Sequence, residues 1–89
     1  MRTLLVQYDL LKPTQNYTDL IDAIKLYPWA KPLYSAFFIR TEKTPKEIVR
    51  ELLPHIDADD KLLVVECAGS WWSENLPEDV LEWLHRELA

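Results

Sequence analysis

Hydrophobic residues gather along the chain in short runs that predict strands and in helical spacings that predict helices. The first run, over residues 4–10, is nearly all apolar, which is typical of a strand buried on both faces of a sheet. A second apolar run, over 62–65, predicts another central strand. Aromatic and β-branched residues over 33–41 predict a third strand, and residues 29–32 could add a short, kinked edge strand.

Two segments between these runs have helical spacing. We expect the first helix to begin near Tyr17, with Asn16 at its N-terminus, and to end before Pro28. The segment 44–47, Thr-Pro-Lys-Glu, contains a Thr cap, a Pro at the first helical position and a Glu that can complete a capping box. It therefore predicts the start of a second helix, which Pro54 ends.

A last helix is expected over about 75–88, where Asn75 and Glu78 repeat the capping pattern. The resulting order is strand, helix, strand or bent hairpin, helix, strand and helix. Short connections would let both middle helices pack on one face of a single sheet. We therefore predict one α+β domain over 1–89, with a ferredoxin-like core over about 2–69 and an added C-terminal helix.

Composition and charge narrow the function and the compartment. The chain carries 15 acidic and 10 basic side chains, a net charge of -5, which opposes non-specific binding to phosphate backbones. Cys67 is the only cysteine, so no intrachain disulfide can form. Neither a secretion signal nor an apolar stretch long enough to span a bilayer is seen. We expect a cytoplasmic protein.

Asp9 is the first candidate for chemistry, because it lies at the end of the first predicted strand. Magnesium and manganese prefer oxygen ligands, and magnesium often needs only one or two protein carboxylates. The commoner role for an Asp just past a strand is to cap a turn with its own side chain. In a homodimer, however, two copies of Asp9 could face one cleft and hold one ion.

Other familiar sites have little support. Asp57, Asp59 and Asp60 suggest a calcium loop, but Leu62 and Ala68 stand where such a loop needs Gly and Glu. The chain's single glycine excludes a glycine-rich phosphate loop, and neither histidine has a partner at zinc-ligand spacing. No motif activates a serine or the cysteine as a nucleophile.

Aromatic and basic residues supply further candidates. Trp71 and Trp72 could cover the core, contact a partner or a second copy, or, less commonly, stack on bases. Lys12, Arg40 and Lys43 are candidate nucleic-acid contacts that could offset the acidic balance locally. A solvated surface of mixed charge is the alternative for these three side chains.

The segments 8–13 and 33–38, with Pro-His-Ile-Asp at 54–57, resemble a group of small proteins. The group includes the CRISPR-associated adaptation nucleases, the related VapD ribonuclease toxins and, most similar, short bacterial "SinR family" proteins. The resemblance implies a ferredoxin-like homodimer in which Asp9, next to Tyr8, is the metal-associated residue. It also makes Tyr8 a catalytic candidate beside Asp9, and Ser35 a weaker one.

The chain departs from that pattern at two places. Leu10 and Leu11 stand where the nucleases often continue with basic residues, and a helix carrying Trp83 replaces their extra C-terminal strand. Two hypotheses follow. The first is a metal-dependent endonuclease acting on RNA or DNA. The alternative is a non-catalytic dimeric adaptor or inhibitor that binds a protein through its acidic surface and Trp71-Trp72, and the charge balance favours this alternative.

Overall fold

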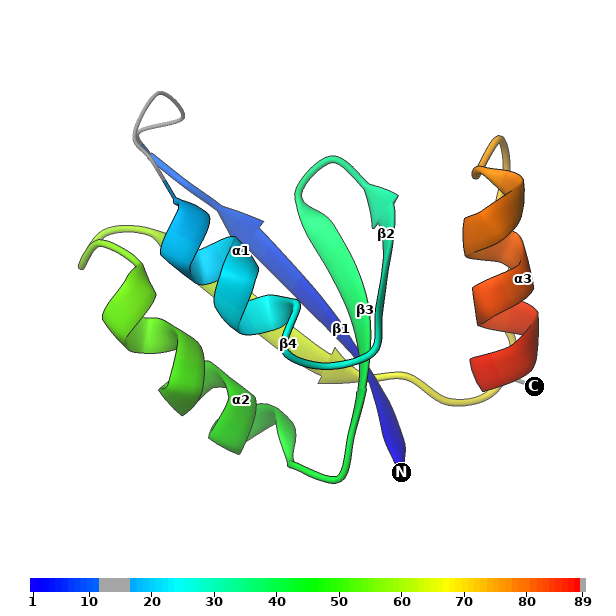
Figure 1. Ribbon diagram of the computed structural model, residues 1–89, viewed down its shortest axis with the longest axis horizontal. Helices are drawn as coiled ribbons and strands as arrows, with labels where there is room; N and C mark the ends of the chain where they lie inside the picture. Colours follow the sequence, from blue (N-terminus) through cyan, green and yellow to red (C-terminus); the bar gives the residue numbers. More distant parts are fainter. Residues whose placement is uncertain (12–16, 89) are drawn as a thin grey trace.

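The computed structural model describes residues 1–11 and 17–88 (Figure 1). The elements are β1 (Arg2–Asp9), α1 (Thr18–Ile24), β2 (Trp29–Leu33), β3 (Ala36–Thr41), α2 (Pro45–Leu52), a 3-10 turn (Leu53–His55), β4 (Lys61–Glu66) and α3 (Glu78–Glu87). The four strands of the described residues form one antiparallel sheet in the order β2-β3-β1-β4. The predicted α+β class is confirmed. The expected cap Asn16 lies outside the described residues.

The main core lies between one face of the sheet and helices α1 and α2. Side chains alternate across a strand, so Leu4, Val6 and Tyr8 of β1 all point to this face. They pack with residues from both helices and from the neighbouring strands: Leu20, Ile24, Ile48, Leu52, Phe37, Ile39 and Val64. Both middle helices therefore cover one face, as predicted from the helical spacing.

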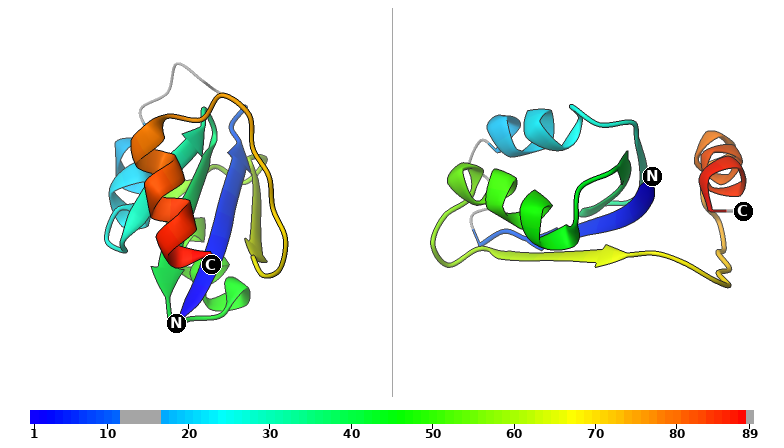
Figure 2. Two further views of the ribbon diagram at one scale, coloured as in Figure 1. Left: turned by 90° about the vertical axis from the view of Figure 1, so that its right-hand side faces the viewer. Right: turned by 90° about the horizontal axis from the view of Figure 1, so that it is seen from below.

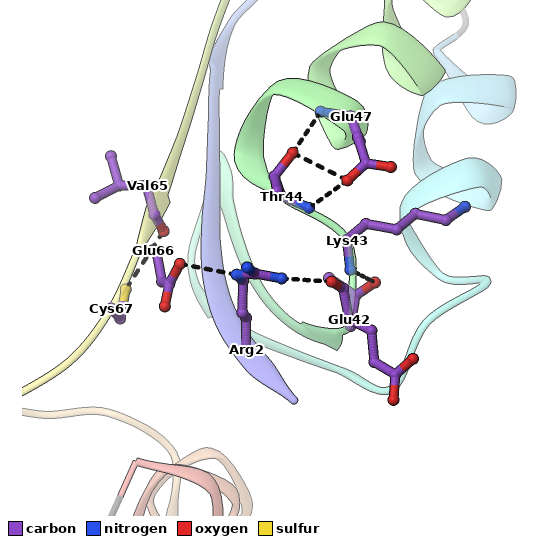
Figure 3. A network of polar contacts seen from close by, with 9 residues as sticks. Arg2, Glu42, Lys43, Thr44, Glu47, Val65, Glu66 and Cys67 are labelled. Carbon is purple, nitrogen blue, oxygen red and sulfur yellow. Dashed lines mark hydrogen bonds and ion pairs between the residues drawn. The ribbon is translucent and has the colours of Figure 1, made fainter.

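The start of α2 is the capping box that the sequence predicts (Figure 3). The Thr44 hydroxyl oxygen accepts a hydrogen bond from the Glu47 backbone N–H at 3.3 Å, and the Glu47 carboxylate accepts one from the Thr44 N–H at 3.0 Å. Hydrogen bonds from the Thr44 backbone and side chain lower the pKa of Glu47. The same bonds satisfy donors that a bare helix end would leave without partners.

Helix α1 is shorter than its apolar spacing predicts. It ends at Ile24, and its first turn carries Asp19. Tyr27 lies beyond the helix, where its hydroxyl and the Lys43 ammonium both bond the Glu51 carboxylate of α2. The apolar period continues past Ile24 because Tyr27 still packs against the core.

The prediction of one unbroken strand over residues 33–41 is wrong, whereas the short edge strand expected over 29–32 is present in β2. Leu33 ends β2 and pairs with Ala36 of β3, so Tyr34 and Ser35 form a tight turn between two strands. Apolar and aromatic residues continue on both sides of this turn, and the sequence has no glycine to mark it. Strand propensity alone therefore could not show the reversal of the chain.

Two further predictions are corrected. Strand β4 is next to β1 but lies at the edge of the sheet, and so is not a central strand. Asn75 does not cap α3, because its φ of 62° is left-handed and Pro77 occupies the capping position with no side-chain hydrogen bond. Pro77 favours the start of the helix at this point through its restricted backbone. The expected capping box is therefore absent from α3.

Helix α3 packs on the opposite face of the sheet from α1 and α2 (Figure 2, left). Val80 and Leu84 are buried against Ala30 of β2, and Trp83 contacts the ring of Phe38 at 6.3 Å between centroids. Within the described residues, no helix is long and apolar enough to cross a membrane. The protein thus has two separate apolar clusters, one on each side of its sheet.

Replacing the helix cap tests the local prediction. We expect Thr44→Ala to lower the free energy of unfolding by about 1 kcal/mol, because the Glu47 N–H loses its acceptor. Thr44→Ser keeps a hydroxyl at the cap, so its free energy of unfolding should lie within about 0.5 kcal/mol of the wild-type value. Urea unfolding followed by circular dichroism measures both. Equal loss in the two variants would contradict the capping role.

Candidate functional site

A groove of about 500 Å³, lined mainly by apolar residues, lies on the α3 side of the sheet. Helix α3 covers mainly β2 and β3, which leaves Leu5 of β1 and Val65 of β4 facing the groove. The far wall is the segment 67–76, which connects β4 to α3 and runs past the sheet in Figure 2. The groove therefore lies between sheet, helix and connecting segment.

The two adjacent tryptophans have different surroundings in this wall. The Trp71 ring lies 5.2 Å from the His85 ring of α3 and packs with the second apolar cluster. Trp72 is 87% exposed, yet it also lines the groove. Trp71 therefore covers the core, as one reading of the sequence expected, whereas Trp72 offers a large aromatic surface to another molecule.

The groove is acidic at its rim. Glu66 and Glu74 line it, and no lysine or arginine is among its described lining residues. The Arg2 guanidinium forms an ion pair with the Glu66 carboxylate at 3.1 Å (Figure 3). Burial raises the pKa of the Cys67 thiol, so this residue stays protonated at neutral pH and is a weak nucleophile.

A second hollow, of about 460 Å³, brings together the catalytic candidates that the family resemblance implies. Tyr8, Asp9 and Ser35 all line it, together with Lys31 and Tyr34. The Tyr8 backbone N–H donates to the Ser35 carbonyl at 3.1 Å, which joins the end of β1 to the β2–β3 turn. We name this hollow the Asp9 cleft.

Its electrostatics limit the chemistry of the Asp9 cleft. Burial, and then the charge of Tyr34, raises the pKa of Tyr8, so the phenol can donate a hydrogen bond but is not a base at neutral pH. The Lys31 ammonium donates to the Tyr34 carbonyl at 2.8 Å and lies over the Phe37 ring. The Lys31 ammonium is the cationic group in this cleft that could bind a phosphate.

Metal binding at Asp9 stays a prediction. Nowhere in residues 1–11 and 17–88 do three acidic, histidine or cysteine side chains come together as ligands. The strand register places Lys61 directly opposite Asp9, and a cation at that position opposes binding of another. By charge alone, Lys61 therefore weakens the attraction of the Asp9 carboxylate for a cation.

The candidate nucleic-acid contacts do not share a surface. Arg40 lies on the α3 side, where its guanidinium contacts the Glu87 carboxylate at 3.0 Å and the Thr3 hydroxyl at 2.7 Å. Lys43 lies on the other side, and its hydrogen bond to Glu51 raises its pKa. Lys12 is outside the described residues. Nucleic-acid binding by these residues stays a prediction.

The acidic turn after α2 has a structural role. The Asp60 carboxylate accepts hydrogen bonds from the Leu11 N–H at 2.9 Å, the Tyr17 hydroxyl at 3.0 Å and the Asp57 N–H at 2.8 Å. It therefore ties together the end of β1, the start of α1 and the turn before β4. These contacts agree with the failed match to a calcium loop.

Sequence reasoning missed Lys31 and Tyr34 in the Asp9 cleft, and Leu5 and Val65 in the groove. Tyr34 belongs to the β2–β3 turn and Lys31 to β2, so a sequence pattern that marked this turn would place both near Ser35. The second pair was assigned to buried strands, because an apolar run does not reveal that one face is left open.

Comparison with known proteins adds no relative. No family model, curated protein or solved structure matches this chain. The resemblance drawn from short motifs therefore stays a prediction. Geometry is the remaining guide to function.

The Arg40–Glu87 pair should hold α3 on the sheet. Both side chains are less than a third exposed, so we expect Arg40→Gln to lower the free energy of unfolding by about 1 kcal/mol and to speed hydrogen exchange in α3. Arg86→Gln is the matched control, because Arg86 also contacts Glu87 but is 63% exposed. Equal effects in both variants would rule out the specific role of Arg40.

Proposed function

We propose that this protein is a homodimeric ferredoxin-like protein that binds a protein partner in its apolar groove, as an adaptor or inhibitor without catalysis. The fold assignment is supported by the order β1-α1-β2-β3-α2-β4 and by a sheet order of β2-β3-β1-β4 with every neighbour antiparallel. This is the connectivity of the split β-α-β arrangement, with α3 added on the other face.

The observation that carries this function is the groove itself. It is larger than the Asp9 cleft and is lined mainly by aliphatic and aromatic side chains, with a few polar groups at its rim. Apolar surface that is left open beside a packed helix is typical of a place where another molecule binds. The exposed Trp72 ring is the kind of side chain that anchors such contacts.

Charge defines the partner more closely. Glu74 lines the groove, and the chain as a whole has a net charge of -5. A partner segment with apolar side chains next to a Lys or Arg would fill the groove and pair with the Glu74 carboxylate. The acidic surface would also steer such a segment toward the site and repel nucleic acids.

The side chains that could perform chemistry favour binding over catalysis. Burial keeps both Tyr8 and Cys67 protonated at neutral pH. Asp9 is opposite Lys61, and no group of three metal-ligating side chains is found among the described residues. Neither Tyr8 nor Cys67 is therefore ready to act as a base or a nucleophile.

Selection from a random peptide library tests the groove. We expect the wild-type protein to enrich peptides with apolar residues next to Lys or Arg. Trp72→Ala should weaken the selected peptides about tenfold or more by calorimetry, because a central aromatic anchor is lost. Glu74→Lys should weaken them through charge repulsion.

Leu26→Ala is the control, since Leu26 is exposed but lies after α1, away from the groove. The groove proposal fails if the peptides bind all four proteins equally. It also fails if no peptide binds. Either result concerns the groove alone, because none of these residues lies on a strand edge.

Nuclease activity is the second candidate, favoured by one observation. Tyr8, Asp9 and Ser35, which were selected from the sequence, line one cleft with the cationic Lys31. A phosphate oxygen could meet the Lys31 ammonium there, and the protonated Tyr8 could donate a hydrogen bond. A role for magnesium or manganese at Asp9 stays a prediction.

Incubation with labelled RNA and single-stranded DNA, with and without magnesium or manganese, separates the two functions. The binding proposal predicts no cleavage above the buffer rate. Cleavage that falls about 100-fold or more in Asp9→Asn but persists in Asp22→Asn, an exposed acid on α1, would replace it with the nuclease. Cleavage equal in both variants would point to a contaminant.

A further inference from the structure

Strand β4 has the composition of a buried strand and the position of an edge strand. Its central residues are Leu-Leu-Val-Val, yet it has a neighbour on one side only. Leu63 is 60% exposed and Val65 is 44% exposed, both on the α3 side of the sheet. A long apolar edge strand without an internal charge or proline is a template for pairing with another strand.

The opposite edge of the sheet is protected. Strand β2 contains Pro32, which has no N–H to offer, and a register irregularity lies between Ala30 and Leu33. Helix α3 also packs on β2. These are the devices by which sheets block edge pairing, and β4 has none of them between its terminal charges.

The backbone of β4 offers its hydrogen-bonding groups outward at alternate residues. The Cys67 N–H donates to the Thr3 carbonyl at 2.8 Å, and in an antiparallel pair the residues bonded to the neighbour alternate with those that are not. Residues 63 and 65 therefore face β1 with their backbone groups. Those of Leu62, Val64 and Glu66 point to the open side.

We propose that a second copy of this chain pairs with β4, antiparallel, about a two-fold axis at Val64. The two sheets then form one continuous sheet of eight strands. This inference rests on the homodimer of the proposed function and specifies how its two chains meet. The contact borders the groove, because Val65 belongs to both.

Symmetry and charge select this arrangement. A two-fold axis perpendicular to the sheet keeps corresponding faces on one side and makes each contact occur twice. With the axis at Val64, Leu63 lies opposite Val65 of the partner subunit, so the exposed apolar side chains cover one another. The Lys61 end of each strand lies beside the partner's Glu66, whereas a parallel pair would align like charges.

A neighbouring register is less favourable. An axis at Leu63 would place Asp60 opposite the partner's Glu66, two carboxylates that repel. It would also set the Lys61 ammonium against the partner's Val65. The axis at Val64 avoids both contacts and uses the outward-facing backbone groups of Leu62, Val64 and Glu66.

The arrangement has consequences for both hollows. From a strand spacing of about 4.8 Å and a rise of about 3.3 Å per residue, the two Asp9 Cα atoms lie roughly 25 Å apart. They cannot share one ion at that distance. The two grooves, by contrast, open on the same side of the continuous sheet. The dimer therefore has two equivalent binding sites related by the two-fold axis.

A charge exchange tests the contact. Wild-type protein should have twice the 10.5 kDa mass of one chain by light scattering at micromolar concentration. The double variants Leu63→Lys with Val65→Lys, and Leu63→Glu with Val65→Glu, should each be monomeric because like charges face each other. An equal mixture of the two should restore the dimer.

Leu33→Lys is the matched control, because Leu33 is also 60% exposed but lies on the protected edge, and it should stay dimeric. Circular dichroism verifies that each variant is folded. A monomeric wild type overturns the proposal and the homodimer together. A dimer that survives either double variant overturns the β4 contact and leaves the homodimer.

Disulfide formation tests the register. With the axis at Val64, residue 61 lies opposite the partner's Cys67, so Lys61→Cys should give a covalent dimer within minutes of mild oxidation. The wild type and Leu63→Cys should stay uncrosslinked, because their thiols are offset along the strands. Crosslinking of Leu63→Cys in place of Lys61→Cys would move the axis to Leu63 or Val65 and overturn the proposed register.

Discussion

The position of β1 between two antiparallel neighbours is the constraint on which the structure depends. Pairing with β3 and β4 uses backbone groups on both sides of β1, and its inward residues Leu4, Val6 and Tyr8 enter the main core. The same register sets the ends of the strand. It brings Asp9 to the β2–β3 turn, and it turns Leu5 toward the groove. One strand therefore positions both hollows.

Local patterns in the sequence predict most helices and strands. Features that depend on contacts between distant residues could not be predicted from it. The capping box at Thr44 and the apolar spacing of α2 depend on residues within a few positions, so they could be read directly. The turn at Tyr34-Ser35 and the edge position of β4 depend on which strands pair, which composition does not encode. An apolar run indicates burial without naming what covers it.

The candidate site follows the same division. Tyr8, Asp9 and Ser35 were selected from the sequence and do line one cleft, because strand ends and turns gather at one end of a sheet. The groove could not be foreseen from the pattern, since it depends on α3 covering only part of the second face. The sequence marks Trp71 and Trp72 as one candidate pair. Only the structure distinguishes the packed Trp71 ring from the exposed Trp72 ring.

Two apolar clusters on opposite faces of the sheet divide the stability of this protein unequally. The main cluster joins both middle helices to all of the strands except β2, whereas the second holds α3 through Ala30, Val80 and Leu84 and a few partly buried neighbours. Cooperative unfolding units of different size open at different free energies. We therefore expect α3 to open at a lower free energy than the sheet. Because Leu84 and Leu88 of this C-terminal segment line the groove, such an opening would also change the shape of the groove.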